Sequence, residues 1–151
     1  MTVEKQPASL ETIEIQKTID IAAPIEIAFE AMLEEIGPEA QIMDGTPMPF
    51  KLEAWPGGRW YRDLGNQTGH LWGHVQVIKP PTLLEISGPM MMSYPSANHI
   101  QYRFTAQGSR TQLAFIHRGF GLITQQHREG LPQGWNKWID KIRDRAEKKV
   151  K

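Results

Sequence analysis

The 151-residue sequence has no cysteine, no excess of charge of either sign and no long apolar run. Without cysteine, the chain can form no disulfide, thiol nucleophile or cysteine-ligated metal centre. Seventeen basic residues balance seventeen acidic ones, so no overall field attracts the chain to nucleic acid or to an anionic membrane. No run approaches the ~18 apolar residues of a membrane span, and the polar N-terminus lacks the core of a signal peptide. We therefore expect a cytoplasmic protein with no nucleic-acid partner and no membrane span.

Established catalytic and cofactor motifs are also missing. The sequence contains no phosphate loop, nucleophile elbow, zinc-protease helix or dinucleotide fingerprint, and we interpret Gly119–Gly121 as a turn after a strand. His70 and His74 are four residues apart on one predicted strand, which separates them by roughly 13 Å. Two ligands of one zinc ion each lie about 2 Å from it, so this spacing does not suit zinc. We predict no metal and no cofactor.

What the sequence does contain is the pattern of an α+β domain. Residues 1–11 are polar and unpatterned, so we interpret them as a loose tail that precedes a single domain at residues 12–151. Isoleucines at odd positions within residues 13–21 predict a strand with one buried face. Pro24 then suits the first turn of a short amphipathic helix that extends to Ile36.

The middle of the sequence predicts an antiparallel sheet. Glycine and proline separate short runs with strand-like alternation, and residues 39–49 form a loop or a short helical turn. Six strands are expected, at residues 50–54, 58–64, 68–79, 83–87, 98–106 and 110–117. An irregular segment with Gly130 and Pro132 leads into an amphipathic helix at residues 134–149, whose apolar stripe must pack on the sheet.

The strand at residues 68–79 allows two interpretations. One set of alternating residues is aliphatic and includes Val75, whereas the other contains Trp72 and its two flanking histidines. Because only one set can face the core, the aliphatic set is expected inside. Trp72 would then be exposed and available for a protein contact such as a homodimer, although a bulge at Gly73 would reverse the alternation locally.

The order of a strand, a short helix, a curved antiparallel sheet and a long C-terminal helix is that of the helix-grip fold. Short motifs occur in matching order: Ala23-Pro24, Gly57-Gly58, Gly73-His74-Val75, Pro80-Pro81, Gly119-Phe120 and Gly134-Trp135. Over about residues 13–142 the chain resembles the SRPBCC superfamily, also called START-like or birch-pollen-allergen-like, and most closely its branch related to the activator of heat-shock protein 90 ATPase. The resemblance implies a cavity for apolar ligands between the sheet and the C-terminal helix. Where many relatives carry a tryptophan after the first helix, this chain has Gln41-Ile42-Met43-Asp44.

The last predicted hairpin supplies most candidate ligand-binding residues, because alternation places one set of its side chains on the inner face. The candidates are Tyr102, Phe104, Phe115 and His117 from the hairpin, Trp135 and Ile139 from the final helix, and Met91 from a methionine-rich loop. The alternative is that these side chains simply fill a core. A buried hydroxyl or imidazole needs a hydrogen-bond partner, and ligand pockets typically contain a few such groups. The methionine triplet could form an adaptable lid or a loop packed on the sheet.

Three functions follow from these observations. The leading prediction is noncatalytic binding of a small apolar ligand between the sheet and the final helix. The second, based on the resemblance alone, is an interaction protein that modulates a chaperone ATPase. The third is an enzyme of cyclase, dehydratase or hydrolase type, with His117 as general acid/base and Tyr102 as orienting group. Since the sequence offers no second catalytic residue at a telling position, binding is preferred over catalysis.

Overall fold

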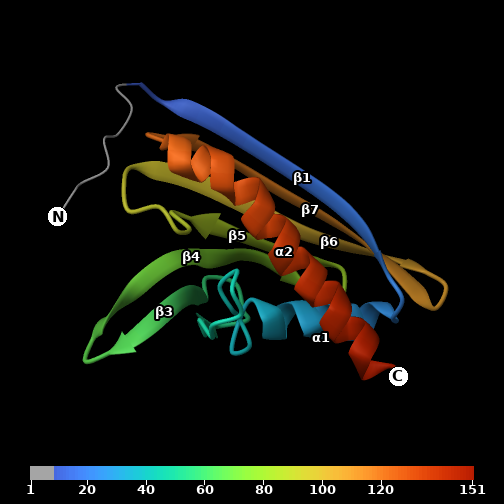
Figure 1. Cartoon of the computed structure of the whole chain (residues 1–151). Coiled ribbons are helices and arrows are strands. Elements are labelled where there is room, and N and C mark those ends of the chain that lie inside the picture. Colours follow the sequence, from blue (N-terminus) through green and yellow to red (C-terminus); the bar gives the residue numbers. More distant parts are fainter. Residues whose placement is uncertain (1–8) are drawn as a thin grey trace.

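In the computed structural model, which describes residues 9–151, these residues form one antiparallel seven-stranded sheet and two helices (Figure 1). The strands are β1 (Glu11–Ile21), β2 (Lys51–Leu52), β3 (Arg59–Gly65), β4 (Thr68–Lys79), β5 (Leu83–Gly88), β6 (Ser96–Gln107) and β7 (Arg110–Gly121). The helices are α1 (Ile25–Glu35) and α2 (Gln125–Lys149). The predicted α+β helix-grip fold is confirmed.

The strand order is β1-β7-β6-β5-β4-β3-β2, so the first strand lies beside the last one. Helix α2 lies across one face of the curved sheet, and α1 lies near its C-terminal half (Figure 1). Apolar side chains fill the space between β6, β7 and α2, and among them Tyr102, Leu113 and Ile139 are completely buried. The core therefore lies between the middle of the sheet and the long helix.

Strand β1 follows the predicted alternation. Ile15 and Ile21 are buried, while Gln16, Thr18 and Asp20 between them are exposed. The strand begins at Glu11, which pairs with Gly121 of β7, so the last residue of the predicted tail belongs to the sheet. Residues 1–8 of that tail lie outside the described residues.

Strand β7 continues past the predicted turn at Gly119–Gly121. Gly119 pairs with Ile13 of β1 and with Asn98 of β6, so it belongs to the sheet. A Cβ atom at Gly119 would lie 2.2 Å from Asn98 Oδ1. The glycine therefore makes room for the asparagine side chain and does not end the strand. At the opposite edge, the predicted strand at residues 50–54 is shorter than expected and comprises Lys51–Leu52 alone.

Helix α2 begins at Gln125, nine residues before the predicted start at Gly134. Thr124 caps it, because the Thr124 hydroxyl accepts a hydrogen bond from the His127 amide at 3.2 Å. Pro132 lies inside the helix and costs one backbone hydrogen bond. Leu131 and Trp135 on either side are buried, so the packing of this segment outweighs its unfavourable helix propensity.

The expectation that Trp72 is exposed is wrong. Trp72 is 6% exposed and packs on Phe50 and Trp60, with ring centroids 4.7 and 5.3 Å away. Trp60 pairs with Gly73, and the next residue of β3 pairs with Leu71, so Trp72 is an extra residue in the ladder. This bulge turns Trp72 inward while Val75 also stays buried. The alternative with a local reversal is the correct one, and an exposed homodimer contact through Trp72 has no basis.

Candidate ligand-binding site

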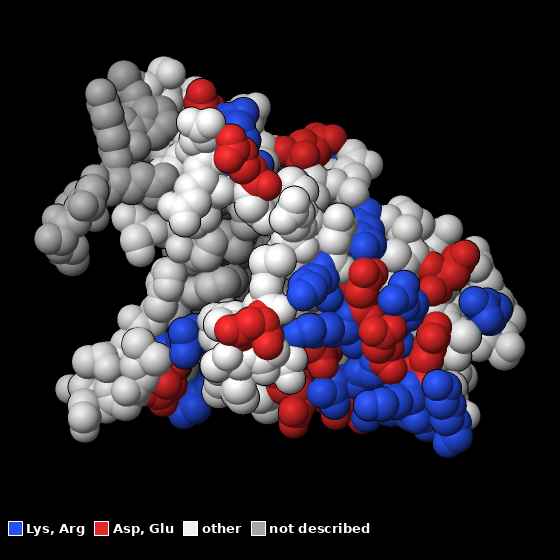
Figure 2. Space-filling view, in the orientation of Figure 1, with Lys and Arg blue, Asp and Glu red and all other residues white. Residues whose placement is uncertain are grey.

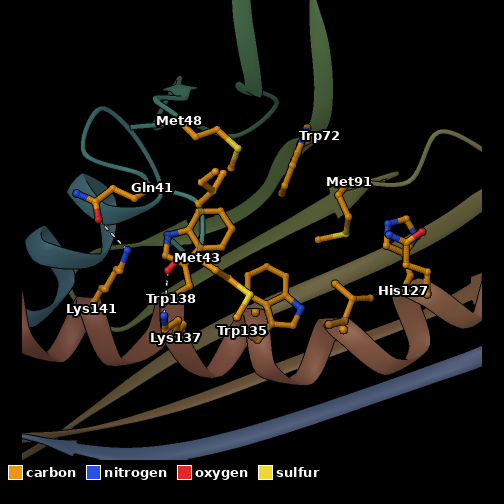
Figure 3. Close-up of a pocket in the computed structure, with 15 residues that line it drawn as sticks. Gln41, Met43, Met48, Trp72, Met91, His127, Trp135, Lys137, Trp138 and Lys141 are labelled. Carbon is orange, nitrogen blue, oxygen red and sulfur yellow. Dashed lines mark hydrogen bonds between the residues drawn. The ribbon is translucent and has the colours of Figure 1, made fainter. Parts of the chain in front are cut away.

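An apolar pocket of ≈ 330 Å³ lies between the loop that follows α1, the N-terminal half of α2, and β4 (Figure 3). Its size is at the lower end of the range for small-molecule sites, about 300–1,000 Å³. Its largest apolar side chains are those of Met43, Met48, Trp72, Met91, Trp135 and Trp138. Apolar contact therefore dominates what this pocket offers a ligand.

Tryptophans form the rigid part of the wall. Trp135 and Trp138 stack with centroids 5.4 Å apart and planes 13° apart, and Trp72 lies edge-on to Trp138 at 6.2 Å. The indole N–H of Trp138 donates to the Glu35 carbonyl at 2.7 Å, and that of Trp72 donates to His70 Nδ1 at 3.1 Å. Because both indole donors are satisfied by the protein, the ring faces are fixed and available for apolar contact.

Methionines form the adaptable part of the wall. Met91 is half-buried between the buried Met90 and Met92, so it projects into the pocket from the loop before β6. Met43 is 50% exposed and Met48 is half-buried, and both come from the loop after α1. Unbranched thioethers repack readily around ligands of different shape. The loop in which this chain departs from the tryptophan of many relatives therefore supplies one side of the pocket.

Two lysines of α2 hold this loop against the helix. Lys137 Nζ donates to the Met43 carbonyl at 2.9 Å, and Lys141 Nζ donates to Gln41 Oε1 at 2.7 Å (Figure 3). Residues four apart lie on the same face of a helix, so both ammonium groups reach the same loop. Hydrogen bonds therefore join the loop to the helix at the pocket edge.

Glycines of α2 create room for the pocket. Gly130 and Gly134 both line it, and a Cβ atom at either position would meet no atom within 4 Å. Gly130 was expected in an irregular segment before the helix, and Gly134 was expected to begin the helix. In the structure they are helical positions whose missing side chains leave the hollow open.

The N-terminus of α2 is braced by a residue that sequence analysis missed. Tyr94 Oη lies 2.8 Å from His127 Nδ1 and accepts a hydrogen bond from the Thr124 amide at 3.3 Å. His127 also lines the pocket. No periodic pattern in the sequence indicates this role of Tyr94, because the residue lies in the loop between β5 and β6. Its partner His127 is 33 residues away in the sequence.

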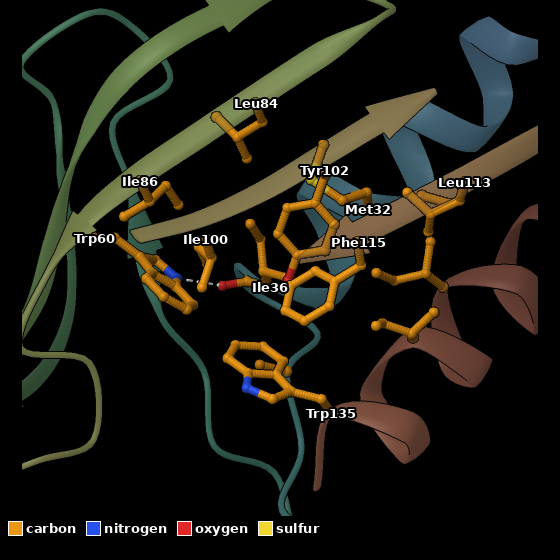
Figure 4. Close-up of a cluster of buried hydrophobic side chains, with 14 of the residues drawn as sticks. Met32, Ile36, Trp60, Leu84, Ile86, Ile100, Tyr102, Leu113, Phe115 and Trp135 are labelled. Carbon is orange, nitrogen blue, oxygen red and sulfur yellow. Dashed lines mark hydrogen bonds between the residues drawn. The ribbon is translucent and has the colours of Figure 1, made fainter. Parts of the chain in front are cut away.

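The predicted ligand-binding residues fall into two groups. Trp135 and Met91 line the pocket. The other five, Tyr102, Phe104, Phe115, His117 and Ile139, lie deeper and are not among its lining residues. Figure 4 shows Tyr102, Phe115 and Trp135 together in the core, and the Tyr102 and Phe115 rings are 5.0 Å apart. Ligand contact by the five deeper residues stays a prediction.

His117 connects this core to the pocket wall. Its Nδ1 atom accepts a hydrogen bond from Trp135 Nε1 at 3.0 Å, and its Nε2 atom lies 2.8 Å from Asn98 Oδ1. Since an indole N–H can only donate, the proton of the neutral ring resides on Nε2 and is donated to Asn98. Burial lowers the pKa of His117 to about 4. These contacts favour a role in positioning Trp135 over proton transfer to a ligand.

Tyr102 has no such network. Its hydroxyl is buried and has no hydrogen-bond partner within the described part of the chain, and burial raises the pKa of this hydroxyl. A buried hydroxyl without a partner is unfavourable. Tyr102 and His117 are therefore not linked as an acid/base pair by any hydrogen bond among the described residues.

Charged side chains gather away from the tryptophans. Figure 2 shows Lys and Arg interleaved with Asp and Glu where α1 and the C-terminal half of α2 lie in Figure 1. Arg145 pairs with Glu35 at 2.5 Å and Lys149 pairs with Glu34 at 2.9 Å, which joins the two helices. Among the described residues, no group of three His, Asp or Glu side chains could hold a metal ion, and no helix has the length and apolar character to cross a membrane.

The fold and the pocket together define a helix-grip protein with an apolar site beside its long helix. The family model described as "Activator of Hsp90 ATPase homolog 1-like protein" matches residues 22–147. The chain belongs to this family, and the predicted resemblance is confirmed.

Solved structures show the same fold at low sequence identity. Mll3558 from Rhizobium loti is 18% identical with a TM-score of 0.70, and the match covers 91% of this chain and 99% of that one. An uncharacterized protein from Rhizobium leguminosarum is 18% identical with a TM-score of 0.69, covering 93% and 97%. The Zhui aromatase/cyclase from Streptomyces sp. R1128 is 15% identical with a TM-score of 0.62, covering 93% and 97%. A search of curated proteins gives no significant match.

Proposed function

We propose that the protein binds a small apolar ligand in the pocket between α2, β4 and the loop after α1. The observation that carries this proposal is the composition of the pocket, in which fixed tryptophan faces stand opposite adaptable methionines. The family membership supports it, since the helix-grip fold is used for apolar ligands and, in the Zhui protein, for aromatase/cyclase chemistry.

The boundaries of the pocket also favour a ligand. Apolar side chains that line an open pocket stay in contact with water, and covering them with an apolar ligand is favourable. Here two helical glycines leave the hollow open, although alanine at either position would favour the helix by about 0.5–1 kcal/mol. A ligand that fills this space would cover the apolar side chains that line it.

The experiment is a binding titration in which 1-decanol displaces a fluorescent lipid probe. Gly134→Leu should strongly weaken binding of both molecules, because the new Cβ meets no atom within 4 Å and the rest of the side chain would occupy the pocket. Asn136→Leu is the matched control, since it introduces the same side chain at an exposed position of the same helix. Equal affinity in the two variants, or no binding by the unmodified protein to a broad apolar panel, would reject the proposal.

The family description favours a second candidate function, which is stimulation of a chaperone ATPase through direct contact. An ATPase assay with the cognate Hsp90-type chaperone tests it. A rate that rises with protein concentration would support this function, and an unchanged rate at micromolar protein would count against it. Because the pocket variant Gly134→Leu alters no exposed charge, it should leave such stimulation intact if the two functions are separate.

A further inference from the structure

We propose that the ligand carries a carboxylate on its apolar body, and that Lys137 and Lys141 bind this group at the edge of the pocket. This inference rests on the proposed function, because it names the chemical class of ligand for the same pocket. Its basis is the charge of the pocket lining and the hydrogen bonds of the two lysines.

The lining is strongly unbalanced in charge. Lys137 and Lys141 both belong to it, and no aspartate or glutamate does. Both ammonium groups lie on the side of α2 that faces the loop after α1 (Figure 3). An apolar ligand with an anionic end would therefore meet two cations and no carboxylate in this pocket.

The two lysines also differ from the basic residues nearby. Arg145 and Lys149 of the same helix form ion pairs with α1, and Lys17 of β1 pairs with Asp140 at 3.0 Å. Lys137 and Lys141 instead donate to a carbonyl and an amide oxygen, and within residues 9–151 neither forms an ion pair. Both bonds already have an ionised donor, and a carboxylate acceptor would add the attraction between opposite charges. A carboxylate would therefore replace these acceptors favourably.

Asp44 is an acidic residue of the loop that interacts with Lys137. Its pKa is lowered first by hydrogen bonds from Thr46 and only in smaller part by the charge of Lys137. The carboxylate of Asp44 is thus committed mainly to its own turn, with Oδ1 accepting from the Thr46 amide at 2.8 Å. Asp44 is exposed and does not line the pocket, so it leaves Lys141 without a counter-charge from this loop.

The ligand geometry follows from this arrangement. The apolar body would contact the faces of Trp135 and Trp138 and the thioethers of the loop, while the carboxylate would lie where Gln41 and Met43 now accept hydrogen bonds. Because the same two ammonium groups hold the loop, a bound carboxylate would compete with the loop for them. A ligand with a carboxylate would therefore change the position of the loop, whereas a ligand without one would not.

The test compares two probes of equal chain length, decanoate and 1-decanol, on the full chain at neutral pH. Decanoate should bind about tenfold more tightly than decanol, the lower end expected for hydrogen bonds to charged groups. In the double variant Lys137→Met/Lys141→Met this preference should disappear, because methionine keeps most of the aliphatic stem and removes the charge. The double variant Lys79→Met/Arg110→Met, at exposed positions of β4 and β7, removes the same net charge and should preserve the preference.

The outcomes separate this inference from the proposed function. If both probes bind the unmodified protein equally and the double variant changes neither affinity, the pocket function stands and the carboxylate inference is wrong. If neither probe binds, the proposed function itself fails. If the affinity for decanol also falls strongly in the double variant, the lysines act by holding the loop. This result would contradict the assignment of a carboxylate site.

Discussion

His117 should make the stability of the protein depend on pH between about 4 and 6.5. The imidazole is completely buried, and burial lowers its pKa from 6.5 to about 4. In this interval the unfolded chain binds a proton at His117 that the folded chain does not. The free energy of unfolding therefore falls as the pH is lowered from 6.5 and levels off below about 4. The contribution of this group is full above pH 6.5.

The magnitude follows from the two pKa values. The difference between 6.5 and about 4 corresponds to a loss of about 3 kcal/mol, since one pKa unit is worth ~1.4 kcal/mol. His117→Gln removes the titrating group and keeps a side chain that can still donate to Asn98. At pH 7 we expect this variant to be less stable than the unmodified protein by about 1–3 kcal/mol, because a buried hydrogen-bonded group is replaced. At pH 4 the unmodified protein has lost about 3 kcal/mol, so the variant should be equally stable or more stable.

The assay is urea denaturation of both proteins at pH 7, 5 and 4, with His74→Gln as the control because His74 is exposed. The difference in the free energy of unfolding between the two proteins reports on His117 alone, because the carboxylates titrate in both. A stability gap that stays constant from pH 7 to pH 4 would refute the assignment of a neutral, buried His117. A gap that grows at low pH would mean that the pKa of His117 is raised by folding, and it would refute the assignment equally.

Four further substitutions test the packing around the site by urea denaturation. Gly88→Ala should destabilise the protein by about 2 kcal/mol or more, because the new Cβ would lie 2.4 Å from the Gly73 Cα and the backbone must move. Gly134→Ala should stabilise the protein by about 0.5–1 kcal/mol, because its Cβ would meet no atom within 4 Å. The opposite ordering would contradict the structure. Thr124→Ala should cost about 1 kcal/mol through loss of the α2 cap, and an unchanged midpoint would show that the cap is unimportant. Trp138→Phe should destabilise by about 1–3 kcal/mol, since the Glu35 carbonyl loses its indole donor, and a neutral result would argue against that contact.

The sheet could be predicted from the sequence because its signal is local. Alternating isoleucines define β1, and alternation in the last hairpin correctly places Tyr102 and Phe115 inside. Where the local pattern is broken, prediction failed. The bulge at Trp72 reverses the alternation of β4. Its position depends on how β3 pairs with β4, which the local sequence pattern does not indicate.

The start of α2 and the pocket were harder to predict because they depend on tertiary contacts. Gly130 and Pro132 are helix breakers by propensity, yet burial of the residues around them keeps the segment helical. The residues around Met43 and Met48 show no periodic pattern, and the two lysines that bond to this loop are distant from it in sequence. The apolar site could be inferred from the resemblance, whereas its location beside this loop required the structure.

A crystal structure of the protein with decanoate tests the central claim most directly. We expect the alkyl chain to lie against Trp72 and Trp135, opposite Met43. The tryptophan side chains of the pocket should keep their positions. A ligand bound on another surface, or an empty pocket at a saturating concentration of decanoate, would contradict the account.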